Sequence, residues 1–385
     1  MKIYLDVSAT LNAGTLSGIQ RTVCEISTTL AEVAEVQLVR WDDVHYALEL
    51  VNLAAFTSAF RNGFRFTDAV RTGIFLTGKA LEPGGVYFDL DSNWHPEFNR
   101  SAVYRMVGKR GLKLAVMLYD VVPLLAPYYL PAYTQAWWVM WLAFALKNAD
   151  LFIVNTRAVE DEFSAICSEV GVQTPRVEVV PLGSEVGLSS ESEDGSGVRE
   201  SLRHIGETRR FILMVGTVEP RKNHAFILES FEESLFQHGL SLVIAGHKGW
   251  MNDDLLVRLS EHSQLGDQLF FIEDASDAEI AFLYRNAYFL AFPSALEGFG
   301  LPMVEALRWG LPVLAADLPV MREVAGTCGD YFELDRPSSF STLVLNYMHD
   351  DPAYQRVKRL AQGYLPMSWS QSARLFRDVL RKLEQ

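Results

Sequence analysis

Short apolar runs recur along the chain and alternate with longer segments whose apolar residues lie three or four positions apart. Uninterrupted apolar runs are typical of strands buried in parallel sheets, and the wider spacing is typical of helices that cover such sheets. The alternation predicts an α/β protein with parallel, doubly wound sheets. The predicted strands are residues 2–7, 36–40, 86–90, 113–118, 151–154, 177–180, 211–215, 240–245, 269–272, 289–292 and 313–316. The main predicted helices are residues 19–34, 253–263, 277–285 and 373–383.

Residues 189–197 interrupt this alternation. Their sequence, SSESEDGSG, has no aromatic or large aliphatic side chain and therefore cannot contribute to a hydrophobic core. A chain of 385 residues is also too long for one ordinary core and long enough for two α/β domains. We therefore expect two domains joined by a linker and followed by a final amphipathic helix. The expected boundaries are 1–183, 184–209, 210–367 and 368–385, and residues 42–80 give no clear prediction.

The stretch 289–317 combines a predicted strand, a loop with Glu297, a helix with Glu305 and a further strand. In open α/β sheets, ligands bind at the carboxyl ends of the strands, which is where this loop lies. Carboxylates accept hydrogen bonds from vicinal hydroxyl groups, so this pair suits a ribose and a sugar. Two other interpretations remain open, namely an acid/base pair of the kind used in glycoside hydrolysis, and structural caps or salt bridges. Gly298 and Gly300 favour a ligand site, because small residues let backbone amides approach a ligand.

Arg221 and Lys222 lie in the loop after the predicted strand 211–215, just before a helix. Two cations beside helix amides suit a diphosphate, and the alternative is an ordinary basic pair on the surface. A similar but weaker anion site is conceivable where the loop ending at Gly18 enters the first helix.

Two further positions carry carboxylates at strand ends. Asp120 follows the predicted strand 113–118 and either faces a ligand or caps the next helix. Asp89 and Asp91 have the spacing of a DxD metal motif. No further ligands follow nearby, so we favour a strand with a polar end over a metal site.

Composition limits the classes of partner. The formal net charge of −14 argues against a general nucleic-acid-binding protein, which needs a basic face. Three widely separated cysteines provide neither a disulfide framework nor a CxxC metal motif, so a reducing cytoplasm is expected. The first residues do not resemble a signal peptide. The apolar run 136–146 is about half of a membrane span, so it predicts a buried helix, or a helix that also touches a membrane surface.

Taken together, these motifs resemble the retaining nucleotide-sugar glycosyltransferases of family 4, which have the two-domain GT-B fold. The resemblance covers most of the chain except residues 42–80 and 184–209. It rests most strongly on EGFGLPMVEA (297–306) and VGTVEPRKN (215–223), and less strongly on SGIQR (17–21), YDVVP (119–123), PLG (181–183) and SWSQSA (368–373).

The resemblance implies a role for each candidate residue. Arg221 and Lys222 would bind the donor diphosphate and stabilise the leaving group. Glu305 would hold the nucleotide ribose, and Glu297 would contact the transferred sugar. Gly18 would close the phosphate side from the N-terminal, acceptor-binding domain, and the final helix would cross back onto that domain. The other expected donor-site groups are Gly216 and the backbone amides of Gly298, Phe299, Gly300 and Leu301.

Asp120 matches a family position that faces the sugar and the acceptor, so the implied catalytic set is Asp120, Glu297, Arg221 and Lys222. The family often has a histidine just before this aspartate, but here the residue is Tyr119, so any role of that histidine is absent or altered. The implied reaction proceeds with retention, and no metal or other cofactor is expected because the two cations stabilise the leaving group.

The variant motifs look most like bacterial transferases that build O-antigen or other surface polysaccharides. GDP-mannose is the first candidate donor, ahead of a UDP-sugar or nucleotide-rhamnose, and a glycan or polyprenyl-linked saccharide is the expected acceptor. Such an enzyme would be cytoplasmic, with contact to the inner face of the membrane through residues 136–146. Two other classes remain, namely another GT-B enzyme such as an epimerase or phosphorylase, and a non-catalytic nucleotide-sugar-binding subunit. Epimerases lack this pair of glutamates in the same context, no pyridoxal-phosphate lysine is identifiable, and the intact Arg221, Lys222, Glu297 and Glu305 argue against a non-catalytic role.

Overall fold

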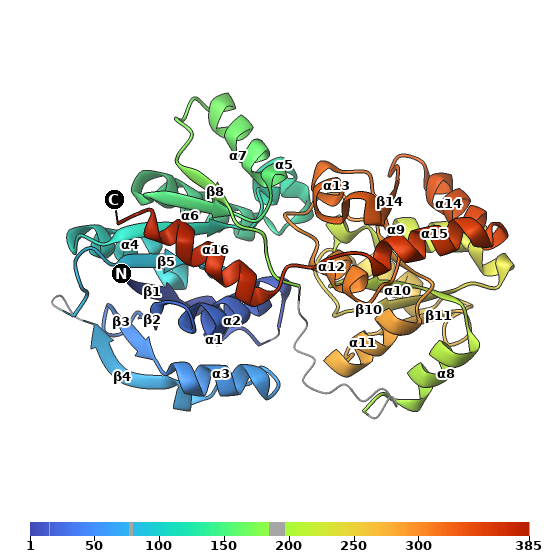
Figure 1. The fold of residues 1–385 in the computed structure, drawn as a ribbon, viewed down its shortest axis with the longest axis horizontal. Coiled ribbons are helices and arrows are strands. Elements are labelled where there is room, and N and C mark those ends of the chain that lie inside the picture. The colour runs from blue at the N-terminus through green and yellow to red at the C-terminus, as the bar shows by residue number, and fades with distance from the viewer. Residues whose placement is uncertain (15, 77–79, 185–196, 385) are drawn as a thin grey trace. The chain divides into compact units, whose positions relative to one another are not determined.

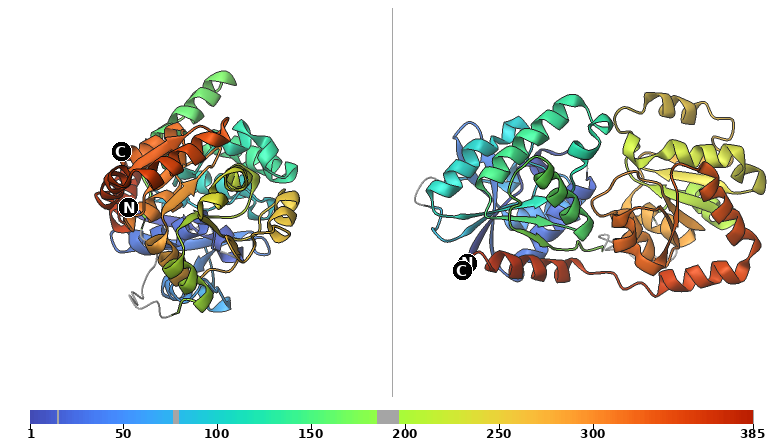
Figure 2. Two further views of the ribbon diagram at one scale, coloured as in Figure 1. Left: turned by 90° about the vertical axis from the view of Figure 1, so that its right-hand side faces the viewer. Right: turned by 90° about the horizontal axis from the view of Figure 1, so that it is seen from above.

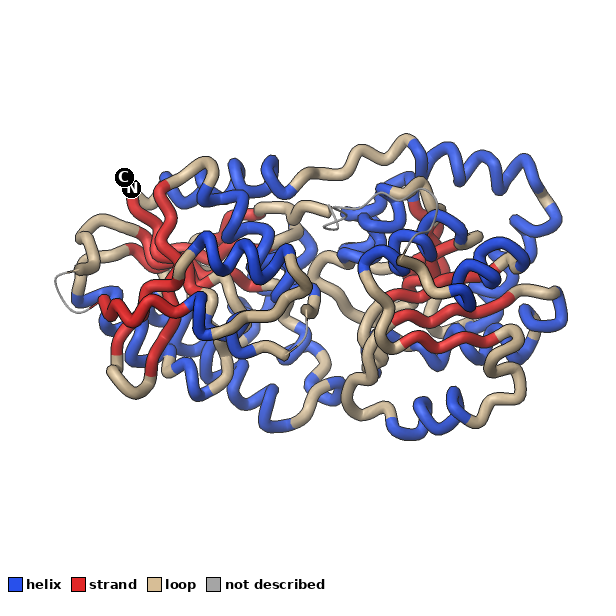
Figure 3. Tube along the Cα trace, turned by 90° about the horizontal axis from the view of Figure 1, so that it is seen from below, coloured by secondary structure: helices blue, strands red, loops and turns tan. Residues whose placement is uncertain are grey.

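A computed structural model describes residues 1–385 except 15, 77–79, 185–196 and 385. The chain forms two compact units (Figure 1). Unit 1 comprises Met1–Pro127, Ala132–Gly183 and Met367–Gln385, and unit 2 comprises Tyr128–Pro131 and Ser184–Pro366. In each unit the strands form a central sheet with helices on both sides (Figure 3).

The sheet of unit 1 has the strand order β4-β3-β2-β1-β5-β6-β7-β8. All neighbouring strands pair in parallel except β2 with β3 and β3 with β4. The strands are β1 (Lys2–Asp6), β2 (Glu35–Asp42), β3 (Ala47–Val51), β4 (Arg71–Leu76), β5 (Val86–Asp89), β6 (Lys113–Leu118), β7 (Leu151–Val154) and β8 (Val177–Val179). The α-helices are α1 (Ser8–Asn12), α2 (Gly18–Ala31), α3 (Leu53–Arg61), α4 (Arg100–Lys109), α5 (Val122–Leu125), α6 (Ala132–Asn148), α7 (Arg157–Glu169) and α16 (Trp369–Arg381).

The sheet of unit 2 is parallel throughout and has the order β11-β10-β9-β12-β13-β14. This is the 3-2-1-4-5-6 order of a dinucleotide-binding sheet, with its switch point between β9 and β12. The strands are β9 (Phe211–Val215), β10 (Ser241–Ala245), β11 (Leu269–Ile272), β12 (Phe289–Phe292), β13 (Val313–Ala316) and β14 (Gly329–Phe332). The α-helices are α8 (Glu200–Thr208), α9 (His224–Glu233), α10 (Asp253–Ser260), α11 (Asp277–Asn286), α12 (Leu301–Arg308), α13 (Pro319–Ala325), α14 (Pro337–His349) and α15 (Asp351–Gln362).

The predicted α/β class and the parallel, doubly wound core of both sheets are confirmed. Residues 42–80, for which the sequence pattern made no prediction, add the antiparallel strands β3 and β4 and the helix α3 at one edge of unit 1. The turn between β2 and β3 contains Tyr46 with a φ of 53°, in place of the usual glycine.

The prediction of a linker through residue 209 is wrong at its C-terminal end, where residues 200–208 form α8. Val198, Leu202 and Ile205 are buried and have helical spacing. A Cβ atom on Gly206 would lie 2.7 Å from the ring of Phe282 on α11, so the two helices pack closely. Most of the polar stretch 189–197 lies outside the described residues.

The last helix of the chain, α16, belongs to unit 1 and packs against α2. Its Trp369 and Phe376 are buried, and the Phe376 ring lies 5.6 Å from the ring of Phe88 on β5. A Cβ atom on Gly183 would lie 2.6 Å from the backbone nitrogen of Trp369, so only glycine fits where α16 begins. The two chain ends lie side by side in unit 1 (Figure 2), where the terminal ammonium group forms an ion pair with Glu384 at 3.2 Å.

Candidate functional site

Two loops follow the strands that flank the switch point of unit 2. The loop after β9 begins at Gly216, whose φ of 139° strongly favours glycine, and ends at Asn223 in the left-handed region before α9. A Cβ atom on Gly246, after β10, would lie only 1.9 Å from the carbonyl oxygen of Gly216. The loop after β10 can therefore pack against the loop after β9 only because Gly246 has no side chain.

Arg221, Lys222 and Glu297 are in direct contact. The Arg221 Nη1 atom lies 2.9 Å from Oε1 of Glu297, and the Lys222 ammonium group forms an ion pair with the same oxygen. Arg221 also forms an ion pair with Glu219 at 2.8 Å. It donates a hydrogen bond of 3.1 Å to the carbonyl oxygen of Leu296. The loops after β9 and β12 are therefore joined by a charge cluster in which two cations balance two carboxylates.

The cluster keeps Glu297 ionised. Burial by itself would raise the pKa of Glu297, but Arg221 and Lys222 more than offset this effect and lower that pKa to about 2. Lys222 also lies 5.1 Å from the centre of the Phe292 ring at the end of β12, in a cation–π geometry. The neighbouring His224 is 2% exposed, and burial together with Lys222 lowers its pKa to about 3, so it is neutral at physiological pH.

Glu305 lies on α12, the helix that follows the loop of Glu297. It is 6% exposed, and its Oε2 atom accepts a hydrogen bond of 2.9 Å from the hydroxyl group of Tyr284 on α11. The helix begins after Gly300, which has a φ of 86°, and no side chain caps it there. Pro302 lies in the first turn, where it costs no backbone hydrogen bond. The remaining predicted amide-bearing residues, Gly298, Phe299 and Leu301, lie in this loop and at the first position of α12.

Gly18 and Asp120 are in unit 1. Gly18 is the first residue of α2, and Ser17 is its N-cap. Asp120 follows β6, and its Oδ1 atom accepts a hydrogen bond of 3.1 Å from the backbone amide of Val122, the first residue of α5. Its role toward a ligand stays a prediction. Tyr119 stands where the family often has histidine. Its hydroxyl group donates a hydrogen bond of 2.8 Å to the carbonyl oxygen of Leu90.

Asp89 and Asp91 lie in buried hydrogen-bond networks, in agreement with the structural interpretation. Asp89 accepts hydrogen bonds from Asn93 and Tyr104 within a buried network that includes Arg100. Asp91 accepts hydrogen bonds from the backbone amides of Thr10 and Ser92, at 2.6 and 2.7 Å. Burial raises the pKa of Asp91 to about 7, although these hydrogen bonds oppose the shift. Among the described residues, no group of three or more histidine, cysteine, aspartate or glutamate side chains could hold a metal ion.

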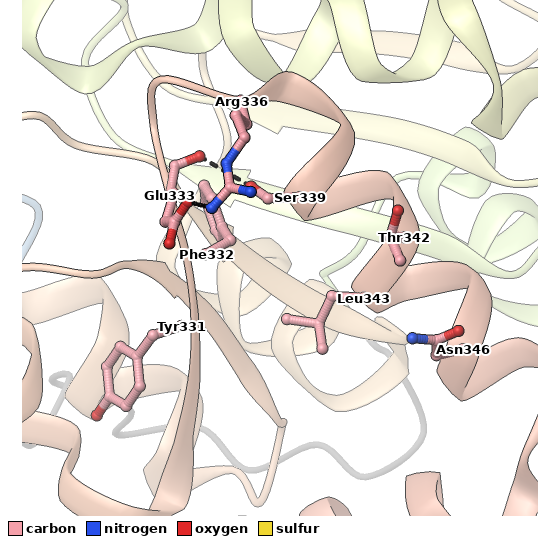
Figure 4. A pocket seen from close by; sticks show the side chains of 8 residues that line it. All are labelled: Tyr331, Phe332, Glu333, Arg336, Ser339, Thr342, Leu343 and Asn346. Atoms are coloured by element: carbon pink, nitrogen blue, oxygen red, sulfur yellow. Dashed lines mark hydrogen bonds and ion pairs between the residues drawn. The ribbon is translucent and has the colours of Figure 1, made fainter.

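A separate cavity of about 260 Å³ lies at the carboxyl end of the edge strand β14 (Figure 4). The paired side chains of Glu333 and Arg336 face each other at one end of it. None of the predicted site residues lines this cavity. Its lining residues are Tyr331, Phe332, Glu333, Arg336, Ser339, Thr342, Leu343 and Asn346.

Sequence reasoning missed two residues of the site. Glu219 lies inside the motif VGTVEPRKN, but nothing in the pattern indicated that it pairs with Arg221. Tyr284 is separated from Glu305 by 21 positions, so only the packing of α11 on this part of unit 2 brings them together. The signal for Tyr284 was a polar aromatic residue on the buried face of a predicted helix, which often finds a hydrogen-bond partner.

The helix α6 has apolar side chains on its exposed side as well as on its buried side. Trp138, Trp141, Leu142 and Ala145 are buried, as expected for the predicted buried helix. Val139, Met140 and Phe144 are exposed, so the helix is apolar on its outer face as well. No helix in the described part of the chain is both long enough and apolar enough to cross a membrane.

Comparison with known proteins agrees with this geometry. Residues 201–363 match the family model described as "Glycosyl transferases group 1". The chain is 32% identical over 390 residues to the serotype-specific mannosyltransferase WbdA of Escherichia coli, with 97% of this chain and 44% of WbdA covered. It is 30% identical over 143 residues to the O-antigen chain mannosyltransferase B of Escherichia coli, with 37% of each chain covered. In both alignments, this chain covers less than half of the length of the curated relative.

Among solved structures, Anabaena Alr3699/HepE in complex with UDP and glucose superposes with a TM-score of 0.71, covering 99% of this chain and 100% of that chain. At 16% sequence identity this similarity shows the fold, which is GT-B with two Rossmann-like units. The family match includes the loops of Arg221, Lys222 and Glu297, and the alignment with WbdA extends the similarity to nearly the whole chain. Residues 201–363 of this chain form a domain of the glycosyl transferases group 1 family.

Proposed function

We propose that this protein is a retaining glycosyltransferase that transfers a hexose from a nucleotide sugar to a glycan or lipid-linked saccharide during the synthesis of a surface polysaccharide. The observation that carries the proposal is the cluster of Arg221, Lys222 and Glu297 at the switch point of the unit 2 sheet. Nucleotides bind at such switch points, and two adjacent cations match the charge of a diphosphate.

The donor binds by exchanging partners within this cluster. The diphosphate takes over Arg221 and Lys222, which stabilise the negative charge of the leaving group. Glu297, released from the two cations, then accepts hydrogen bonds from hydroxyl groups of the sugar. Arg221 retains Glu219 as a partner throughout, which keeps its side chain in place.

The ionisation of Glu297 supports a positioning role over an acid/base role. A general acid must hold a proton near neutral pH, and Glu297 meets the donor without one, because its pKa is about 2 while Arg221 and Lys222 contact it. In the proposed reaction, the bond between C1 of the sugar and the phosphate oxygen breaks, and its electron pair leaves with the phosphate. The acceptor oxygen bonds C1 on the same face and passes its proton to the departing phosphate. Asp120, a residue of unit 1, orients the acceptor.

Mannose is the first candidate for the sugar, and GDP-mannose for the donor. The two relatives compared above carry mannosyltransferase names, and one of them aligns with nearly the whole of this chain. A UDP-sugar is the second candidate, because the superposed Anabaena structure holds UDP and glucose. Nucleotide-rhamnose is a third.

A screen of thermal stability with GDP-, UDP-, dTDP- and ADP-sugars, followed by analysis of the product formed from the best donor, tests the proposal. We expect GDP-mannose to raise the melting temperature most and to yield an α-mannoside from its α-linked donor. If only a UDP-sugar stabilised the protein, the proposed donor would change to that sugar nucleotide, and the proposed reaction would stand. If no nucleotide sugar stabilised the protein, the assignment of the site would fail.

We also propose that unit 1 contacts a membrane surface through α6. This helix exposes apolar side chains, and it packs against α4 (Figure 1). Neither helix contains an acidic residue, although the whole chain has a net charge of −14, and α4 exposes the basic residues Arg105 and Lys109. Apolar side chains bordered by cations suit an anionic bilayer. Such a contact would bring the enzyme to a lipid-linked acceptor.

A further inference from the structure

Exposed aromatic rings lie at the carboxyl end of the unit 1 sheet. Tyr46, in the turn after β2, is 60% exposed, and Tyr133, in the first turn of α6, is 59% exposed. The side chain of His95, in the loop after β5, is 44% exposed. Ligands of open α/β sheets bind at this end of the strands, so the rings are placed where a ligand of unit 1 would lie.

These rings belong to one connected set, which we call the aromatic row and which comprises Tyr46, His95, Tyr133 and Trp137. The His95 ring packs edge-on against Trp137, with 4.4 Å between the ring centres, and the Trp137 ring lies 5.0 Å from that of Tyr133. Tyr46 joins the set through Asn99, whose side-chain amide donates a hydrogen bond of 3.0 Å to the tyrosine hydroxyl group. Asn99 and His95 cap the two ends of the same short 3₁₀ turn, so the contacts run without a break from Tyr46 to Tyr133.

The backbone that carries Tyr46 is strained. Tyr46 has a φ of 53° and its partner Asn99 a φ of 40°, in the left-handed region that a bulky side chain rarely adopts. Glycine is the usual residue in such a turn. The ring of Tyr46 is also fixed from below by the buried Trp41, at 5.1 Å between ring centres and 73° between ring planes. Strain that holds an exposed ring in one orientation indicates a functional surface, because folding alone would favour glycine here.

The chemistry of the row suits a saccharide. A sugar ring has apolar C–H groups that pack on an aromatic face, and hydroxyl groups that bond to polar atoms at the edge of a tyrosine or an imidazole ring. A bilayer contact needs a continuous apolar face, and single-stranded nucleic acid needs cations beside the rings. The row instead contains two phenols and an imidazole, and the carboxylate of Glu97 lies 3.6 Å from His95.

We propose that the aromatic row binds the acceptor as an oligosaccharide, with one sugar unit on Tyr46 and another on the rings of Trp137 and Tyr133. The loops of Tyr46 and His95 follow β2 and β5, which are separated by β1, so they lie about 10 Å apart along the sheet. This distance exceeds the width of a single sugar ring. The proposal rests on the proposed function, because it names the part of the acceptor that unit 1 recognises. The row holds the acceptor and takes no part in the bond changes.

Tyr46→Gly separates binding from folding. Glycine adopts a φ of 53° without strain, so this variant loses the ring and should keep a melting temperature within a few degrees of wild type. Tyr133→Ala removes a second exposed ring from a helical position where alanine is favourable. Phe144→Ala is the matched control, because Phe144 is an exposed aromatic residue of the same helix but lies near its other end.

The decisive measurement is calorimetry on the full chain with short oligosaccharides of mannose, rhamnose, glucose or galactose, each compared with its monosaccharide. We expect at least one oligosaccharide to bind more tightly than its monosaccharide. Tyr46→Gly and Tyr133→Ala should each weaken this binding by roughly fivefold, the order expected for one aromatic contact, and Phe144→Ala should not. In turnover, the two row variants should raise the acceptor KM and leave the donor KM unchanged.

Sedimentation with vesicles that contain phosphatidylglycerol distinguishes the row from a membrane surface. If Tyr46→Gly and Tyr133→Ala reduced sedimentation but left oligosaccharide binding intact, the rings would contact lipid and the proposal would fail. If nucleotide sugars stabilised the protein but no oligosaccharide bound more tightly than its monosaccharide, the row would be overturned and the proposed function would stand. Oligosaccharide binding that depends on the row, in a protein that no nucleotide sugar stabilises, would support the row and remove the donor site.

Discussion

Lys222 forms an ion pair with Glu297, a residue 75 positions further along the chain, and the pair spans the switch point of the unit 2 sheet. The same oxygen of Glu297 also contacts Arg221. One carboxylate oxygen therefore holds both cations that we assign to the donor diphosphate.

Removing either partner of this pair should impair transfer without unfolding the protein. We expect Lys222→Ala and Glu297→Ala each to lower kcat/KM by roughly tenfold or more, the scale of losing one charge-stabilising contact. Arg258→Ala is a suitable control, because Arg258 on α10 also pairs with a carboxylate, Glu232 on α9, and neither residue belongs to the candidate site. Steady-state kinetics with the identified donor measures the effect. Near-normal turnover in both site variants would remove the site assignment.

The pH dependence of stability should report the ionisation of Glu297. Its pKa of about 2 in the folded protein lies below the ordinary value of 4.5, so its contribution is complete above pH 4.5 and is lost as the pH falls toward 2. By linkage this contribution is roughly 3 kcal/mol at neutral pH. We expect the melting temperature of Glu297→Gln to fall less than that of wild type between pH 6 and pH 3.

The comparison with Glu297→Gln is needed because other groups titrate in the same range. Glu279, paired with Arg199, also has a pKa lowered to about 2 despite its partial burial. It is present in both proteins, so it contributes equally and cancels in the difference. Parallel curves for wild type and variant would contradict the strong ion pairing of Glu297.

Chelation should leave the reaction unchanged. The proposed stabilisation of the leaving group comes from Arg221 and Lys222, so treatment with EDTA followed by gel filtration should not alter kcat. The measurement is turnover of the treated enzyme with and without added Mg²⁺. An absolute requirement for Mg²⁺ would count against this mechanism.

The membrane proposal predicts binding that depends on both charge and apolar contact. We expect the protein to sediment with vesicles that contain phosphatidylglycerol and much less with vesicles of phosphatidylcholine alone. Met140→Glu on the exposed face of α6 should reduce binding severalfold, while Val257→Glu, at an exposed position of α10 in unit 2, should not. Equal sedimentation of all three proteins, or of none, would contradict the assignment of α6.

Much of the fold was predictable because most strands are continuous apolar runs. The edge of the unit 1 sheet was not, and β3 shows the reason. This strand contains Glu49, which is 1% exposed and is held by Arg40 and Arg71. A buried charge that is neutralised by partners from β2 and β4 breaks the hydrophobic pattern on which strand prediction depends. Its partners are known only once the strands are paired.

The candidate site shows the same limit at the level of single residues. Arg221, Lys222, Glu297 and Glu305 were identifiable because each lies in a motif at a strand or helix end. Their contact partners were not, because pairing is a property of tertiary structure. The helix α8 is a different case, since its buried residues had helical spacing, but the polar sequence before it concealed the pattern.

The placement of α16 in unit 1 affects how the protein is made. Residues 184–366 are synthesised before Trp369 and Phe376, whose side chains complete the core of unit 1. Domains commonly fold as they emerge from the ribosome, the N-terminal one first. Here the order is reversed at the last step, because the whole of unit 2 is available before unit 1 receives its final helix. A released chain that ends at residue 366 would therefore hold a complete unit 2 and an unfinished unit 1.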